Sequence, residues 1–171
     1  MPPRVDNPVG PETQLRVSLR ETPPVDGGAA LEGAAWIWHP DTKLLKGFAT
    51  LRTSFDIPAN AKIDYARLTF SCDNGAVVKF NGREVARQGN GSEAWRRLSV
   101  KDVRSALKPG RNTVEAFCEN TIDGLAGLMA SIDIVAGGKP MRVFTDPKTW
   151  EASLDGISMD LKLLKNQFLK W

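Results

Sequence analysis

The chain has 171 residues, of which 42% are hydrophobic, and 23 Lys and Arg against 20 Asp and Glu give a net charge of +3. This length fits one domain of ordinary size with additional segments. The charge lies far below the excess typical of a dedicated nucleic-acid-binding protein. No apolar run approaches the ~20 residues of a membrane helix. With one histidine and two cysteines, most zinc sites, most histidine-based triads and a dense disulfide scaffold are excluded.

Residues 1–33 are rich in proline and glycine, which predicts a linker or the end of an upstream module. Within them, Leu15, Val17 and Leu19 alternate with polar residues and would share one face of a short strand. A disordered leader is the alternative. The first ten residues lack the apolar stretch of a secretory signal peptide.

Residues 34–152 are typical of an all-β domain, because short stretches of alternating apolar and polar residues are separated by turn signals. The predicted strands cover residues 36–38, 48–55, 66–72, 76–80, 83–87, 113–120, 125–135 and 141–144. Asn81-Gly82 is a strong hairpin signal, since both residues tolerate the positive φ of a type I′ turn. One helical turn is predicted over 101–107, capped by Asp102.

This spacing of short strands predicts an antiparallel β-sandwich or jelly roll. Trp36 and Trp38 alternate on a strand and therefore face opposite sides, so that one of them is expected in the core. Cys72 and Cys118 both fall on inward faces by the period of two. A buried pair of thiols is the preferred interpretation, and a disulfide, which would suit export, is the alternative.

Residues 153–171 differ from the domain before them and predict a short C-terminal amphipathic helix. Leu161, Leu164, Phe168 and Trp171 follow the 3,4,3 spacing of a helix face, with lysines between them. Such a helix either packs back on the domain, begins a next module, or docks through residues 160–171 on a partner protein or a membrane surface.

Several motifs occur in an order that resembles the galactose-binding-like jelly-roll domains, including the carbohydrate-binding module of bacterial α-L-rhamnosidases and related modules of planctomycete multidomain proteins. They are Trp36-x-Trp38, Leu51-Arg52-Thr53-Ser54-Phe55, Cys72-Asp73-Asn74-Gly75, Phe80-Asn81-Gly82, Lys108-Pro109-Gly110-x-Asn112, Asn120, Gly127-Leu128 and Thr145-Asp146-x-x-x-Trp150. The resemblance covers about 34–152. It is more specific for the fold than for a ligand, because this fold hosts sugar binders, protein binders and structural modules.

The resemblance implies a site at a strand end, where Asp73 and Asn74 match an Asp-Asn pair of the rhamnose-binding modules. In those modules a calcium ion bridges protein and sugar, and oxygen ligands of this kind suit that ion. Asp73 and Asn74 are therefore the expected calcium ligands. An Asx-turn that only closes the strand connection is the alternative.

Four further residues are candidates for ligand binding. Trp95 follows a polar loop that contains Glu93, and an exposed indole there would stack on a sugar, unless it closes the sandwich edge. Arg96 beside it offers donors for hydroxyl groups or acidic sugars. Asn120 ends a strand, and in the resembled family such a residue can face the binding loops; otherwise it is a turn residue.

The leading hypothesis is a non-catalytic carbohydrate-binding module of a larger glycan-active protein, secreted or periplasmic, with carbohydrate and its neighbouring domains as partners. A small sandwich offers little cleft for the paired carboxylates of glycoside hydrolysis, so an enzyme is not expected. The alternative is a structural or protein-interaction module that docks through its C-terminal helix.

Overall fold

The structure is a computed structural model that describes residues 30–40, 46–89, 91 and 93–154. The described chain forms nine β-strands and two short 3-10 turns, which run in the order β1 (Gly47–Ile57), β2 (Ile63–Asp73), β3 (Gly75–Phe80), β4 (Arg83–Gln88), η3 (Ala94–Arg96), β5 (Ser99–Asp102), η4 (Arg104–Ala106), β6 (Gly110–Asn120), β7 (Gly127–Ala136), β8 (Lys139–Phe144) and β9 (Glu151–Ser153).

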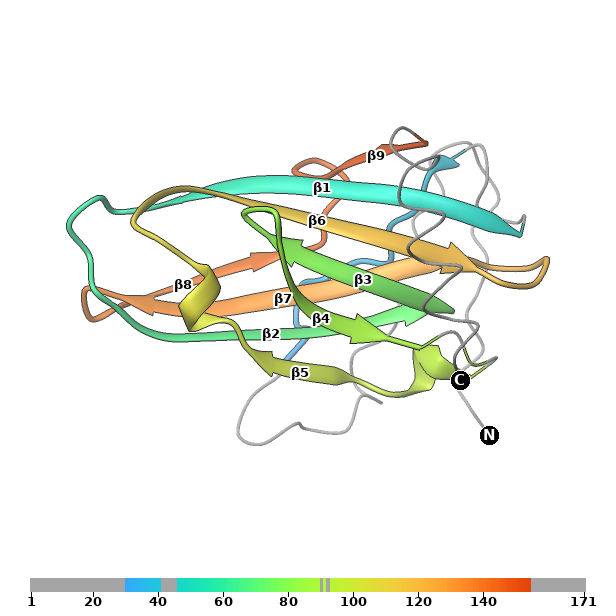
Figure 1. The fold of residues 1–171 in the computed structure, drawn as a ribbon, viewed down its shortest axis with the longest axis horizontal. Helices are drawn as coiled ribbons and strands as arrows, with labels where there is room; N and C mark the ends of the chain where they lie inside the picture. Colours follow the sequence, from blue (N-terminus) through green and yellow to red (C-terminus); the bar gives the residue numbers. More distant parts are fainter. Residues whose placement is uncertain (1–29, 41–45, 90, 92, 155–171) are drawn as a thin grey trace.

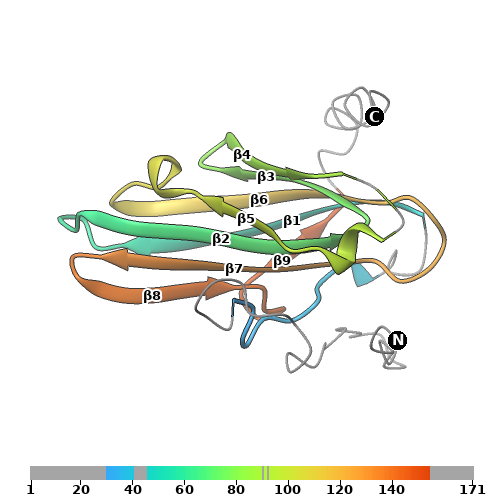
Figure 2. The same cartoon turned by 90° about the horizontal axis from the view of Figure 1, so that it is seen from below.

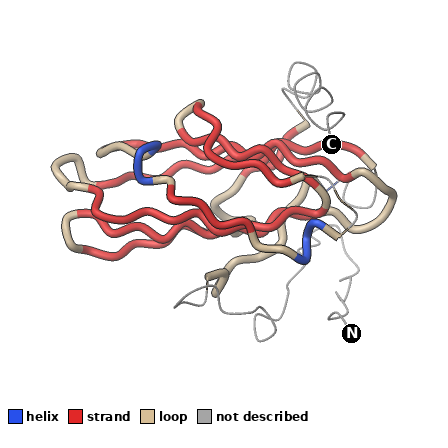
Figure 3. The backbone as a smooth tube through the Cα atoms, turned by 60° about the horizontal axis from the view of Figure 1, so that its bottom comes forward, coloured by secondary structure: helices blue, strands red, loops and turns tan. Residues whose placement is uncertain are grey.

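Two antiparallel sheets lie face to face, as Figures 1 and 2 show. One has five strands in the order β4-β3-β6-β1-β9, and the other has four in the order β5-β2-β7-β8. The tube view in Figure 3 shows how little of the domain is helical. The predicted all-β sandwich is confirmed.

The core lies between the two sheets because alternate residues of each strand are apolar. On β2 the inward residues Ala66, Leu68, Phe70 and Cys72 are at most 2% exposed, and this is the face that the alternation predicts. Trp38 joins this core, whereas Trp36 packs in a second cluster outside it. The opposite orientation of the two indoles is therefore confirmed. The members of the second cluster are Leu31, Ala34, Trp36, Met129, Trp95, Leu98, Leu125 and Phe144.

The predicted hairpin at Asn81-Gly82 is confirmed, with φ of 51° and 80° at the two residues. The Asn81 amide also donates to the carbonyl of Ala106 (2.9 Å) and to Oδ1 of Asn112 (2.9 Å). The turn residue therefore ties the β3–β4 hairpin to the connection before β6.

The helical turn predicted over 101–107 is shorter than expected. Residues Ser99–Asp102 form the edge strand β5, and only Arg104–Ala106 form a turn, η4. Val103, not Asp102, is the N-cap of this turn, although Oδ1 of Asp102 accepts the backbone N–H of Arg104 (2.9 Å). The difference arises because pairing with β2 keeps the first part of the segment extended.

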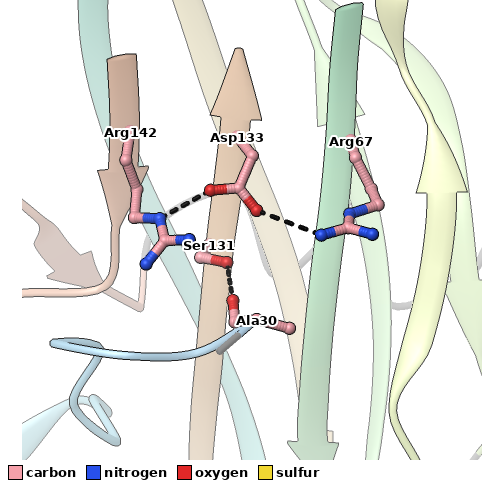
Figure 4. A network of polar contacts seen from close by, with 5 residues as sticks. All are labelled: Ala30, Arg67, Ser131, Asp133 and Arg142. Carbon is pink, nitrogen blue, oxygen red and sulfur yellow. Dashed lines mark hydrogen bonds and ion pairs between the residues drawn. The ribbon is translucent and has the colours of Figure 1, made fainter. Parts of the chain in front are cut away.

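The outward face of the four-stranded sheet carries a row of alternating charges across its strands. Asp102, Arg67, Asp133 and Arg142 stand opposite one another in successive strand pairs. Asp133 contacts Arg142 (2.5 Å) and Arg67 (3.6 Å), as Figure 4 shows. Opposite charges on neighbouring strands stabilise this strand order. Beside them, the Ser131 hydroxyl donates to the carbonyl of Ala30.

At the margins of the sandwich, the strand β9, which pairs with the edge of β1, was not predicted. Residues 30–34 fall mostly in the segment predicted as a linker, and Leu31 and Ala34 belong to the second cluster. The predicted C-terminal helix and its docking through 160–171 lie outside the described residues. Among the described residues, none belongs to a helix long and apolar enough to cross a membrane.

Candidate functional site

One end of the sandwich, which we call the corner end, contains residues 73–75, 88–89, 91, 93–97 and 120–127. There β2 ends at Asp73 and β3 begins at Gly75, in the other sheet. Asn74 is the single residue between these two strands, and the Asp73–Asn74 peptide bond is cis. The corner, η3 and the loop between β6 and β7 lie at the right-hand end of Figure 1.

Asn74 is buried, and its polar groups bond to the protein. Its side-chain Oδ1 accepts the backbone N–H (2.8 Å) and the hydroxyl (2.9 Å) of Thr121. Its Nδ2 donates to Oδ1 of Asp73 (2.6 Å), and its backbone N–H donates to the carbonyl of Glu119 (2.8 Å). Asn74 therefore holds the corner to the end of β6 and orients the carboxyl group of Asp73.

Gln88 supports the same corner from β4. Its Nε2 donates to the carbonyls of Cys72 (2.6 Å) and Asn74 (3.1 Å), and its Oε1 accepts the N–H of Cys72 (3.1 Å). Sequence analysis missed this residue, because a glutamine at a predicted strand end is expected to begin a loop. The only indication of its role in the sequence is that Gln88 directly follows the second strand of the predicted hairpin, whose first strand begins shortly after Asp73-Asn74.

Asp73 is half-buried at the end of β2, on the outward face of the four-stranded sheet. Burial raises the pKa of its carboxyl group from 3.8 to about 6, because the charged form loses hydration. At neutral pH the carboxylate is mostly ionised. A partly desolvated carboxylate in a fixed position is a strong hydrogen-bond acceptor for a ligand hydroxyl.

Trp95, Arg96 and Glu93 lie together around η3, next to the end of β2. The hydroxyl of Ser71, two residues before Asp73, donates to the carbonyl of Trp95 (2.6 Å). The guanidinium of Arg96 lies 5.1 Å from the centre of the Trp95 ring. It also pairs with Glu93 at 3.1 Å. The indole is half-buried in the second cluster, so it both closes the sheet edge and leaves part of its surface accessible.

A second indole, that of Trp36, lies beside Asp73. Gly127 is the register partner of Asp73 on β7. A Cβ atom at Gly127 would stand 2.7 Å from Cε3 of Trp36, so the ring lies directly on the glycine. The alternation of Trp36 and Trp38 predicted two faces but did not indicate that the outer indole lies at the corner end.

Asn120 is buried at the end of β6, and its Nδ2 donates to the carbonyl of Gly124 (3.2 Å). The loop it closes also contains Asp123, whose Oδ1 accepts the N–H of Lys46 (3.0 Å). Ile122 in the same loop is 56% exposed. In this geometry Asn120 shapes the loop, and a direct role in ligand binding stays a prediction.

The structure thus brings the sequence-predicted residues together at one end of the molecule, in two groups joined through β2. The first group is Asp73, Asn74 and Asn120, and the second is Glu93, Trp95 and Arg96. In the second group and at Asp73, the side chains are accessible, whereas Asn74 and Asn120 are at most 1% exposed.

A calcium ion at the corner would fit Asp73 better than Asn74. The acceptor oxygen of Asn74 already receives two hydrogen bonds from Thr121, and it would have to exchange them for the metal. Among the described residues, no three His, Cys, Asp or Glu side chains are grouped so that they could hold a metal ion. Asp73 is therefore the residue of the Asp73-Asn74 pair that such an ion would use.

Structural comparison finds the same fold in proteins that act on or bind sugars. An α-L-rhamnosidase of Streptomyces avermitilis, solved with L-rhamnose, matches 72% of this chain with 30% identity and a TM-score of 0.66. A lectin of Pleurotus ostreatus, solved with GalNAc, matches 73% with 22% identity and a TM-score of 0.63. A GH78 family rhamnosidase of Bacillus sp. GL1 matches 71% with 26% identity and a TM-score of 0.54.

These similarities confirm the galactose-binding-like sandwich that the resemblance predicted. This chain spans only 12% of the Streptomyces enzyme, 37% of the lectin and 13% of the Bacillus enzyme. No family model matches the sequence, and no curated protein does.

Proposed function

We propose that this chain is a non-catalytic carbohydrate-binding module of a larger glycan-active protein, and that it binds sugar at the corner end. The observation that carries the proposal is the geometry of this end: Asp73, with its half-buried carboxylate, follows Ser71, whose hydroxyl donates to the carbonyl of Trp95, and pairs with Gly127, which the buried Trp36 indole covers. Sugars need both features, since their hydroxyls require fixed polar partners and their C–H faces pack on aromatic rings.

The comparisons support the module interpretation. The two rhamnosidases are 30% and 26% identical to this chain, and in each of them the matched part is a small fraction of the enzyme. A sugar-binding module attached to a larger enzyme is consistent with such partial coverage. We propose on the same basis that the whole protein is exported, as a secreted or periplasmic protein that meets polysaccharide.

Each accessible residue has a distinct role in the proposed site. The carboxylate of Asp73 accepts hydrogen bonds from two neighbouring hydroxyls of one sugar ring. The exposed part of the Trp95 indole packs against the ring's C–H surface, and Arg96, held by Glu93 at 3.1 Å, donates to a third hydroxyl. Asn74 and Asn120 position the strand ends. A site of this kind buries few ligand atoms, so the affinity is modest.

The pKa of Asp73 gives the proposed binding a pH dependence. With its pKa near 6, the carboxyl group is ionised at pH 7 to 8 and gains a proton as the pH falls below 6. The protonated group is a weaker acceptor, so we expect the association constant for the sugar to be constant above pH 7 and to decrease below pH 6.

Isothermal titration calorimetry with L-rhamnose and with N-acetylgalactosamine tests the proposal. We expect heat of binding for at least one of these sugars, and its loss in Trp95→Ala and Asp73→Asn. Tyr65→Ala is the matched control, because this 41% exposed aromatic residue lies at the opposite end of β2. Equal affinity in the wild type and in Trp95→Ala would contradict the proposal, and so would an absence of binding to a wider glycan array.

Calcium stays a prediction that the same titration tests. If calcium bridges Asp73 and the sugar, EDTA abolishes the sugar heat and added Ca²⁺ restores it in the wild type but not in Asp73→Asn. Sugar binding unchanged by EDTA would show that the carboxylate binds hydroxyls directly. The alternative function, docking on a protein partner through 160–171, concerns residues outside the described ranges and also stays a prediction.

A further inference from the structure

The two cysteines of the chain lie next to each other beneath the corner end. Cys72 and Cys118 are both free thiols, and both side chains are completely buried. The thiol of Cys72 donates to the carbonyl of Gly75 (3.2 Å), and the residue after Gly75, Ala76, is the register partner of Cys118. Cys72 belongs to the four-stranded sheet and Cys118 to the five-stranded sheet, so the pair lies across the core between the layers.

The corner explains why the two sheets approach each other closely at Cys72 and Cys118. After Cys72 the chain passes through Asp73 and Asn74 and enters the other sheet at Gly75. The next residue, Ala76, is the register partner of Cys118. The strand neighbour of Cys118 is therefore a residue only four positions after Cys72 in the chain. On its other side Cys118 pairs with Ala49, so a small side chain flanks Cys118 on each neighbouring strand.

We propose that Cys72 and Cys118 form a disulfide site that joins the two sheets when the protein folds in the presence of a small disulfide such as oxidised glutathione. One cysteine thiolate attacks the glutathione disulfide and releases one glutathione thiolate. The second cysteine thiolate attacks the resulting mixed disulfide and releases the other. The two cysteines lose two electrons and two protons in total, and one glutathione disulfide becomes two glutathione thiols.

The burial of the two thiols determines at which stage of folding this reaction occurs. Both cysteine side chains are 0% exposed in the folded domain. A small disulfide therefore cannot reach either sulfur atom once the core has closed. The bond forms in the unfolded or partly folded chain, and the folded domain then protects whichever redox state it has enclosed.

The bond would close a loop of ~45 residues, which restricts the unfolded chain strongly. It would also fix the two strand ends that position Asp73 and Asn120. From the chain-entropy effect we expect the oxidised domain to melt about 10 °C above the reduced domain.

Refolding of the full chain tests this proposal without reference to any sugar. The reduced, denatured protein is refolded with reduced and oxidised glutathione and is then analysed by intact mass spectrometry and by thiol titration in denaturant. We expect a mass lower by two hydrogen atoms, no remaining thiol, and a peptide pair that links Cys72 to Cys118. Cys72→Ser and Cys118→Ser are the controls, and each must retain its single thiol or carry one glutathione.

Two results would overturn the proposal. The first is a refolded wild type that retains two titratable thiols, or that carries glutathione on each cysteine in place of the internal bond. The second is an oxidised protein that melts below the reduced protein, which would show that the bond does not fit the fold. Native, already reduced protein exposed to the same glutathione mixture should react much more slowly than the refolding chain, and equal rates would contradict the role of burial.

Discussion

Replacement of Gln88 by methionine tests whether one side chain holds the corner between the two sheets. Gln88 is 7% exposed, and its amide makes three hydrogen bonds to the backbone of Cys72 and Asn74, at 2.6, 3.1 and 3.1 Å. Methionine has a similar shape but neither donates nor accepts effectively. Each buried backbone group left without its partner costs about 1–3 kcal/mol, so we expect the loss of three partners in Gln88→Met to lower the free energy of unfolding by about 3–9 kcal/mol.

Urea unfolding followed by tryptophan fluorescence measures this change, with an unchanged m-value expected if the folded state stays compact. Arg83→Met is the matched control, because Arg83 is an exposed residue of the same strand, and we expect an effect below about 0.5 kcal/mol. Gln88→Glu keeps the acceptor but loses the donor, and its stability should recover as the carboxyl group gains a proton at low pH. A loss smaller than about 1 kcal/mol in Gln88→Met would refute the reasoning.

Three further substitutions test other parts of the structure. Gly127→Ala places a methyl group 2.7 Å from the indole that covers it, and we expect a loss of about 1–3 kcal/mol in urea unfolding. Gly47→Ala, which meets nothing within 4 Å, is its control and should be nearly neutral. Asp133→Asn removes the charge between two arginines, and it should cost about 1–2 kcal/mol by thermal unfolding. Asp56→Asn, in an exposed pair, should leave the melting temperature unchanged. Because the pKa of Asp73 rises to about 6 on folding, the folded state holds this proton more tightly than the unfolded state. The wild type should therefore lose stability relative to Asp73→Asn as the pH rises from about 4 to about 6, and parallel pH profiles would contradict this.

The layers and the inward faces of this fold follow from the sequence because their signals are local. Alternation over seven residues or more identifies which side of β2 and β6 is buried, and Asn81-Gly82 identifies one hairpin by its backbone preferences alone. By contrast, β9 has three residues and pairs only with β1, so it has too few positions to show a period.

The position of the candidate site could be predicted from the sequence, but the role of each of its residues could not. Asp73 and Asn74 are adjacent, and the sequence does not indicate which of them is buried, because this depends on the direction in which the chain leaves β2. Asn74 turns toward Thr121, which lies 47 positions away. The contribution of Gln88 is also non-local, since its partners Cys72 and Asn74 lie 16 and 14 positions before it.

The passage from β2 to β3 has a consequence for how such a module can change its preferred ligand. Asn74 alone separates the two strands, and every added residue would displace both sheets at once. At the corner end we therefore expect insertions and deletions to be tolerated in the segments 89–98 and 121–126 and not between β2 and β3. We expect the length of these two segments to set the size of the saccharide that the module accommodates, while the passage between the strands stays fixed.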